Sequence, residues 1–160
     1  MKLQELLAFP GRIMKNIQLV LIGIMLFAWL CCAEDVFSGE NAMKMHIDVG
    51  GKTLVATLAD NSSARALAEQ LGKGAITVNM RDYGNMEKVG PLPTNLPRND
   101  TDLRTGPGDI ILYQGNQFAI YYDTNAWNLT QLGKIDGATK QGLLDVLGKG
   151  SVSVTLSLAE

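Results

Sequence analysis

The charged residues that could carry chemistry gather in one segment rich in glycine, proline, asparagine and aspartate. Arg81, Asp82 and Glu87 flank Tyr83 there. An arginine and a carboxylate that line a cleft, here Arg81 and Glu87, suit an extended peptide or a small polar ligand. The alternative is a salt-bridged loop pinned to its own domain, because most surface charges have no role in a site.

An aromatic cluster forms the second place of interest. Tyr121 and Tyr122 are neighbours in a β-type run, so their side chains point to opposite faces and only one can face a given pocket. Trp127 lies in a predicted loop over 123–128, where its ring can stack on a ligand or close the end of the domain as a lid. The predicted ligand-binding residues are Arg81, Tyr83, Glu87, Tyr122 and Trp127.

Residues for nucleophilic or metal chemistry are scarce. His46 is the single histidine and shares a predicted strand face with Lys44 and Asp48, so we expect it to be exposed and to ligate no metal. The segment 106–109 lacks the Lys-Ser/Thr of a phosphate loop and leads into a strand. We interpret it as a turn in which Asp109 accepts from backbone donors. The sequence predicts no catalytic constellation, no cofactor and no metal site.

Both cysteines lie in an apolar leader. Twenty-three of the first 33 residues are apolar, and the run over 17–30 lies between basic residues and Cys31-Cys32-Ala33. A basic start, a short apolar run and a small-residue exit are typical of a secretory signal peptide. The predicted organisation is a signal peptide over 1–33, with Met14 as an alternative start, a linker over 34–42 and a domain over 43–160.

Cleavage after Ala33 predicts an exported protein of the periplasm or cell envelope, which meets the membrane only through its leader. An uncleaved anchor is the alternative, although the run is shorter than the ~18–20 residues that span a bilayer. Lipidation of Cys31 or Cys32 is a further alternative. The residues before these cysteines are larger than the small ones typical of lipoprotein signals.

The charge balance argues against nucleic acid as a partner. The 160 residues carry a net charge of −2, and from residue 34 onward 15 acidic residues face 11 basic ones. A phosphate backbone is bound by basic surfaces, which this domain lacks in bulk. Without cysteine the domain has no disulfide framework and no thiol nucleophile, and its length allows one domain.

Alternation of apolar and polar residues predicts strands for most of the domain. Strands are expected over 44–49, 53–58, 76–80, 110–113, 118–122, 129–135 and 152–158, and helices over 61–72 and 136–147. Residues 81–102 are expected to form a long loop with one irregular strand. About seven alternating strands predict a mainly β fold: a closed or nearly closed barrel with two short helices, the last strand pairing near the first.

Six different short motifs follow one another between about residues 43 and 158. They are DNSSARAL at 60–67, MRDYGNMEK at 80–88, LPTNL at 92–96, GDIILY at 108–113, FAIYY at 118–122 and LGKID at 132–136. In this order they resemble a small bacterial cyclophilin-like family. The resemblance implies a compact cyclophilin-type β-barrel capped by two helices, in a family without an assigned activity. It does not imply prolyl isomerase activity, because neither Arg81 nor His46 aligns with the arginine and histidine of true cyclophilins.

The first function hypothesis is an exported binding module that holds a peptide segment or a small molecule in a surface groove. The alternative is a peptidyl-prolyl isomerase with non-standard residues, because this reaction needs only an apolar bed and one donor to the prolyl nitrogen. A structural part of a larger envelope complex is the third hypothesis.

Overall fold

Nine strands and two helices make up residues 42–159, which are the residues that this computed structural model describes. In chain order they are β1 (Lys44–Val49), β2 (Lys52–Leu58), α2 (Ser62–Leu71), β3 (Ile76–Tyr83), β4 (Glu87–Pro91), β5 (Thr101–Arg104), β6 (Asp109–Tyr113), β7 (Gln117–Tyr121), β8 (Ala126–Ile135), α3 (Lys140–Leu147) and β9 (Val152–Leu158). The predicted leader and residues 34–41 of the predicted linker lie outside the described residues. Over residues 42–159, no helix is both long and apolar enough to cross a membrane.

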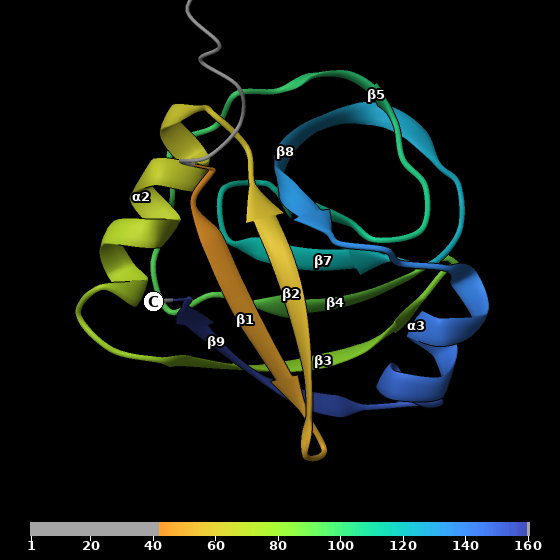
Figure 1. Ribbon diagram of the computed structural model, residues 1–160. Helices are drawn as coiled ribbons and strands as arrows, with labels where there is room; N and C mark the ends of the chain where they lie inside the picture. Colours follow the sequence, from red (N-terminus) through yellow and green to blue (C-terminus); the bar gives the residue numbers. More distant parts are fainter. Residues whose placement is uncertain (1–41, 160) are drawn as a thin grey trace, which may run out of the picture. The chain divides into compact units, whose positions relative to one another are not determined.

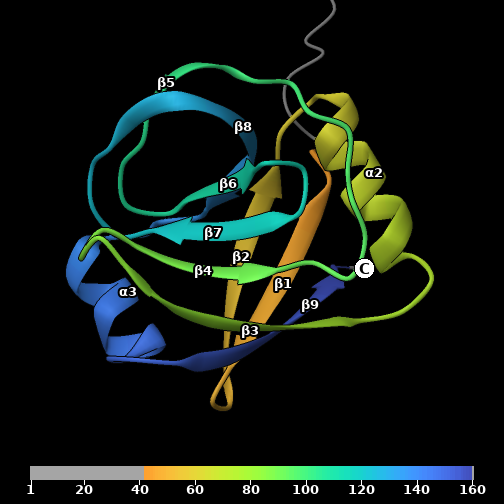
Figure 2. The same cartoon turned by 180° about the vertical axis from the view of Figure 1, so that it is seen from behind.

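The strands form one antiparallel sheet that closes on itself. Its order is β2-β1-β9-β3-β4-β7-β6-β8-β5, and β2 also pairs with β8. Eight strands therefore make a closed barrel, while β5 extends the sheet beyond β8. Figures 1 and 2 show α2 and α3 on opposite sides of this barrel. The prediction of a mainly β barrel with two helices is confirmed, and so is the pairing of β9 with β1.

Local turn and cap chemistry sets the ends of several elements. Gly50 and Gly51 have φ of 54° and 82°, the left-handed values that a tight hairpin between β1 and β2 requires. The Asn61 side chain accepts from the backbone N–H of Ala64 at 2.9 Å and caps α2. Thr139 caps α3 in the same way, so this helix begins at Lys140 rather than in the predicted region just after Ile135.

The prediction of a long loop with one irregular strand over 81–102 is wrong at its start. β3 continues to Tyr83, and a turn at Gly84 and Asn85, with φ of 59° and 55°, leads directly into β4. Polar side chains at Arg81 and Tyr83 are compatible with a strand here because both are exposed on the outer face of the barrel. The predicted loop around Trp127 is also wrong, because β8 begins at Ala126 and pairs with β5.

The barrel core is built from the inward-pointing half of the strand residues. It includes Met45, Val78, Ile110, Phe118 and Leu156, all of them almost fully buried. Both helices contribute to this core with leucines at helical spacing, which explains their amphipathic pattern. The interior is therefore packed with side chains from both helices and from the barrel strands.

The seam between β2 and β8 closes the barrel. Only three residue pairs make up its ladder, and Gly133 lies opposite Leu58 in it. A Cβ atom at Gly133 would lie 2.4 Å from the carbonyl oxygen of Thr57, so only glycine lets the two backbones approach. Beside the seam, Asp136 accepts from Lys44 Nζ at 2.6 Å and from Thr57 Oγ1 at 2.8 Å. These contacts join β1, β2 and the end of β8.

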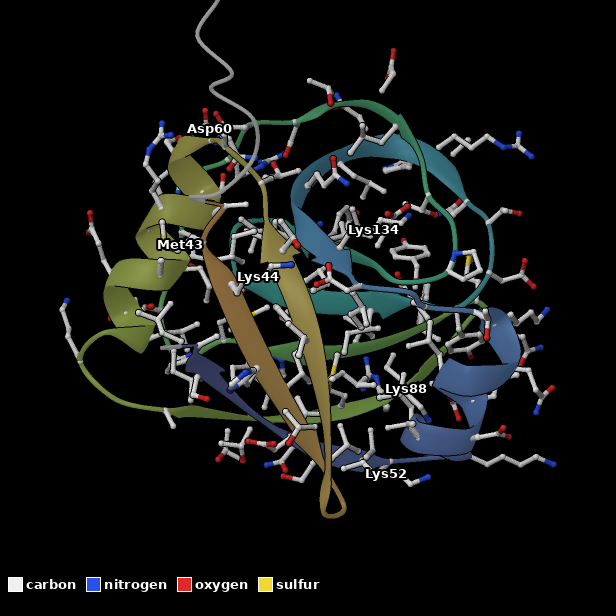
Figure 3. All side chains as sticks on the ribbon, viewed as in Figure 1. Met43, Lys44, Lys52, Asp60, Lys88 and Lys134 are labelled. Carbon is white, nitrogen blue, oxygen red and sulfur yellow. The ribbon has the colours of Figure 1, made fainter. Side chains whose placement is uncertain are left out.

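A fully buried lysine joins the β3–β4 hairpin to the segment that follows α3. Lys88, which Figure 3 labels, has no exposed surface. Its Nζ lies 2.7 Å from Asp82 Oδ1 and 2.6 Å from the carbonyl oxygen of Gly150. The backbone N–H of Gly150 donates to Asp82 Oδ2 at 2.6 Å. The hydrogen bond from Lys88 is the main reason why the pKa of Asp82 lies below its usual value. Lys88, Asp82 and Gly150 therefore form one mutually satisfied cluster.

Removing the two charges of this cluster one at a time should lower the free energy of unfolding by unequal amounts. Asp82→Asn leaves the buried ammonium without its counter-charge and should lower the free energy of unfolding by about 3 kcal/mol. Lys88→Met leaves Asp82, whose side chain is 34% exposed and can be solvated, so the loss should be smaller, about 1–2 kcal/mol. Urea unfolding at pH 7 measures both. Equal losses would contradict the assignment of Lys88 as the buried partner.

Candidate functional site

The outer face of the barrel carries a row of three side chains from adjacent strands. Tyr83 of β3 pairs with Glu87 of β4, and Glu87 pairs with Tyr121 of β7. Cross-strand partners lie on the same face of a sheet, so the carboxylate stands between two phenol rings. Tyr83 is 58% exposed, whereas Glu87 is 8% and Tyr121 3% exposed. The row therefore runs from the surface into a covered corner.

A second row lies beside the first and is mostly apolar. Arg81 of β3 pairs with Val89 of β4, Val89 with Ala119 of β7, and Ala119 with Ile111 of β6. Alanine is the smallest of these side chains and lies between two branched ones. The second row therefore forms an apolar floor that ends in the guanidinium of Arg81.

The ribbon of β5 and the first half of β8 covers part of this floor. Figure 1 shows β8 as an arch with β5 alongside it. Near the base of the arch the β6–β8 register shifts between Ile110 and Ile111, an irregularity of the kind that bends strands. Leu129 of β8 and Leu103 of β5 pack with Ile111 and Ala119 in a small apolar cluster separate from the barrel core. The ribbon thus makes a wall above the outer face.

A hollow of about 440 Å³ lies between this wall and the two rows, and we call it the groove. Its lining residues are Arg81, Tyr83, Glu87, Val89, Ile111, Tyr113, Gln114, Gln117, Ala119, Tyr121, Asn125, Trp127 and Leu129. An adjoining hollow of about 630 Å³ shares Arg81, Val89 and Gln117 with it and continues across β3 to β9. The two hollows therefore adjoin at these three residues on the outer face.

Glu87 and Tyr121 are ionisable groups of the groove whose pKa values are shifted by burial. Burial raises the pKa of the Glu87 carboxyl above the usual value, and a hydrogen bond from Tyr121 opposes this effect. Burial also raises the pKa of Tyr121, as does its hydrogen bond to Glu87. Asn125 Nδ2 lies 3.3 Å from the phenol oxygen and donates to it. Within residues 42–159, no lysine, arginine or histidine nitrogen lies within 4.0 Å of the Glu87 carboxylate.

The structure brings four of the five predicted ligand-binding residues together. Arg81, Tyr83, Glu87 and Trp127 all line the groove, and Trp127 is 63% exposed at its rim. Tyr122 lies elsewhere: it is buried in the barrel core, with its phenol oxygen 3.4 Å from Asp82 Oδ1. Its neighbour Tyr121 points to the groove instead, so the expectation that only one of the two faces a pocket agrees with the geometry.

The alternative of a salt-bridged loop describes only Asp82. Asp82 pairs with buried Lys88, while Arg81 and Glu87 form no ion pair within the described part of the chain. His46 is half-buried between exposed Lys44 and Asp48 on β1, and none of these three lines the groove. Asp109 accepts from the backbone N–H of Gly106 at 2.7 Å, as the turn interpretation expected.

Sequence reasoning missed the floor and much of the rim of the groove. The missed residues are Val89, Ile111, Tyr113, Gln114, Gln117, Ala119, Tyr121, Asn125 and Leu129. One signal for part of this set is present in the sequence: Glu87 and Val89 continue a period-two pattern across the turn from Arg81 and Tyr83. Extending the strand beyond Met80 would have placed these four side chains on one face.

Fold and groove together define a cyclophilin-like barrel with a depression on its outer surface. The model of the Cyclophilin-like family matches residues 47–157, and the chain belongs to this family. The chain is similar to the solution structure of the hypothetical protein AF2241 from Archaeoglobus fulgidus, with a TM-score of 0.54 and 15% identity over 78% of this chain and 100% of that one. No curated protein matches the chain.

The raised pKa of Glu87 predicts a pH dependence of stability. The folded state holds this proton more tightly than the unfolded state, so the contribution of Glu87 is complete below its ordinary pKa and is lost as the pH rises through the folded pKa. Glu87→Gln should therefore become more stable relative to wild type as the pH rises from 4 to 7.

Denaturant unfolding of both proteins at several pH values measures this difference. Glu69→Gln on α2 is the matched control, because Glu69 is exposed and distant in sequence from the groove strands. It should show no such pH-dependent gain. A constant difference between wild type and Glu87→Gln from pH 4 to pH 7 would contradict the burial of the carboxyl.

Proposed function

We propose that the barrel is a binding module that holds an extended peptide segment in the groove. The observation that carries this proposal is that two adjoining hollows share Arg81, Val89 and Gln117 across the outer strands. An apolar floor with a few polar groups at its edge is typical of ligand sites. A compact small molecule would fill only one of the two hollows.

The rim supports the same proposal. Trp127, Tyr83 and Tyr113 are 63%, 58% and 40% exposed, which is costly for large aromatic surfaces unless a partner covers them. Aromatic and arginine side chains dominate the binding energy of many interfaces. Arg81, exposed beside the floor, can donate to the backbone carbonyl groups of a bound segment.

Peptidyl-prolyl isomerisation is the second candidate function. Arg81 stands at the end of the apolar floor that begins at Val89, so one donor lies next to an apolar bed. A prolyl ring on this floor would bring its nitrogen toward the guanidinium. The reaction lowers the barrier of about 20 kcal/mol to rotation about the prolyl bond.

Peptide binding is tested with the full chain and acetylated, amidated tetrapeptides Ala-Phe-Xaa-Phe, in which Xaa is Pro, Ala, Lys or Glu. At least one peptide should shift the amide resonances of Val89 and Ala119 and the indole resonance of Trp127 in NMR titrations. Trp127→Ala should weaken this binding about tenfold, because an aromatic anchor contributes over ~1 kcal/mol. Val55→Ala on β2 is the control, since Val55 is an exposed apolar residue that does not line the groove.

The same titration separates the two functions. Exchange spectroscopy on the proline peptide should show no acceleration of cis–trans interconversion if the barrel only binds. Acceleration that disappears in Arg81→Met would establish the isomerase instead. If none of the four peptides shifts the groove resonances, the binding proposal fails.

Export is part of the proposal, and the apolar run over 17–30 supports it. When the full chain is produced in a bacterium, the exported form should begin at Glu34. Mass spectrometry of that form measures the cleavage site. A diacylglyceryl group on Cys31 or Cys32 would show a lipid anchor instead, and an intact leader would show an uncleaved one.

A further inference from the structure

The row of Tyr83, Glu87 and Tyr121 gives the groove a corner that the apolar floor does not explain. Glu87 is 92% buried there, as its 8% exposure implies, and it lines the groove. Its partner among the described side chains is the neutral phenol of Tyr121. Buried carboxylates are normally paired with a cation, and this one has none within 4.0 Å in residues 42–159.

Three other carboxylates of the barrel are each paired with a lysine. Asp82 pairs with Lys88, Asp109 with Lys134 and Asp136 with Lys44, each at 2.6 to 2.7 Å. Figure 3 labels all three of these lysines. Glu87 is at least as buried as any of these three aspartates and differs from them in lacking an ion-pair partner. The position is therefore suited to a cation that comes from outside the chain.

We infer that the groove binds a peptide segment through a lysine side chain, whose ammonium group pairs with Glu87 between the rings of Tyr83 and Tyr121. Aromatic faces beside a carboxylate attract an ammonium group by cation–π interaction as well as by charge. The aliphatic stem of a lysine would lie on the floor beside Val89. This inference rests on the proposed peptide binding.

The charges around the corner are compatible with this occupant. Arg81 lies in the neighbouring row, where it faces Val89 rather than Glu87, and forms no ion pair with the carboxylate. The aromatic neighbour Tyr121 is neutral at pH 7, because burial raises its pKa above the ordinary value. From residue 34 onward the chain has 15 acidic and 11 basic residues, so a cationic segment meets a domain of opposite net charge.

The test uses the full chain and two peptides that differ by one charge. These are the acetylated, amidated tetrapeptide Ala-Phe-Lys-Phe and the same peptide with Nε-acetyl-lysine, which keeps the stem and removes the charge. Calorimetry at pH 7 should show that the charged peptide binds wild type about tenfold more tightly than the acetylated one, a difference of about 1.4 kcal/mol. In Glu87→Gln the two affinities should become equal.

Glu69→Gln is the control for the loss of one negative charge, and it should keep the tenfold preference. Equal binding of both peptides to wild type would overturn the lysine inference while leaving peptide binding intact. Binding of neither peptide, together with no shift from the other three tetrapeptides, would overturn the proposed function itself. Binding of n-butylamine alone, without either peptide, would assign the corner to a free amine. That result would overturn the inference that the ammonium group belongs to a peptide lysine.

Discussion

The closure of the sheet between β2 and β8 is the constraint on which the rest of the structure depends. Three residue pairs form this seam, and Gly133 allows its backbones to approach. Without it the eight-stranded barrel would have two open edges, with unpaired backbone donors and acceptors. Closure defines an inside and an outside for every strand. The contacts of Asp136 with Lys44 and Thr57 hold the seam from the outer side.

Because the barrel is closed, adjacent residues of one strand enter different environments. Lys88 points inward and is satisfied by Asp82 and Gly150, while Glu87 points outward into the groove. Tyr121, at the end of β7, belongs to the outer apolar cluster. Tyr122, the next residue, belongs to the barrel core. The strands β4, β6 and β7 therefore support two apolar clusters at once, and the groove is built on the outer one.

Local patterns were sufficient to predict most of the barrel. Alternation over 44–58 and 152–158, the glycine pair at 50–51 and the cap at Asn61 each correspond to an observed element. The strand at Arg81–Tyr83 was missed because its outward side chains are polar and its turn, Gly84-Asn85, resembles loop composition. Period-two patterns establish that Tyr121 and Tyr122 face opposite sides, but the pairing partner decides which one faces the core.

The groove itself follows from long-range pairing. Val89, Ala119 and Ile111 lie on three strands, and no local pattern joins them until β4, β7 and β6 pair in register. Arg81, Tyr83 and Glu87 were predictable as a group because one hairpin holds them. Trp127 was predictable as an aromatic residue with a free face, although its strand was not, because β5 and the start of β8 are exposed and weakly apolar.

The energetics of the groove differ from those of the rest of the barrel. Elsewhere burial of the inward leucines stabilises the fold, and the polar contacts of buried Lys88 are complete. In the groove a buried carboxyl without a cation and an exposed indole each leave favourable interactions unmade. Such residues contribute little to folding stability at neutral pH, and a bound ligand would supply their missing interactions. They are expected at binding sites, where stability is exchanged for function. The groove is the part of the described chain where these features coincide.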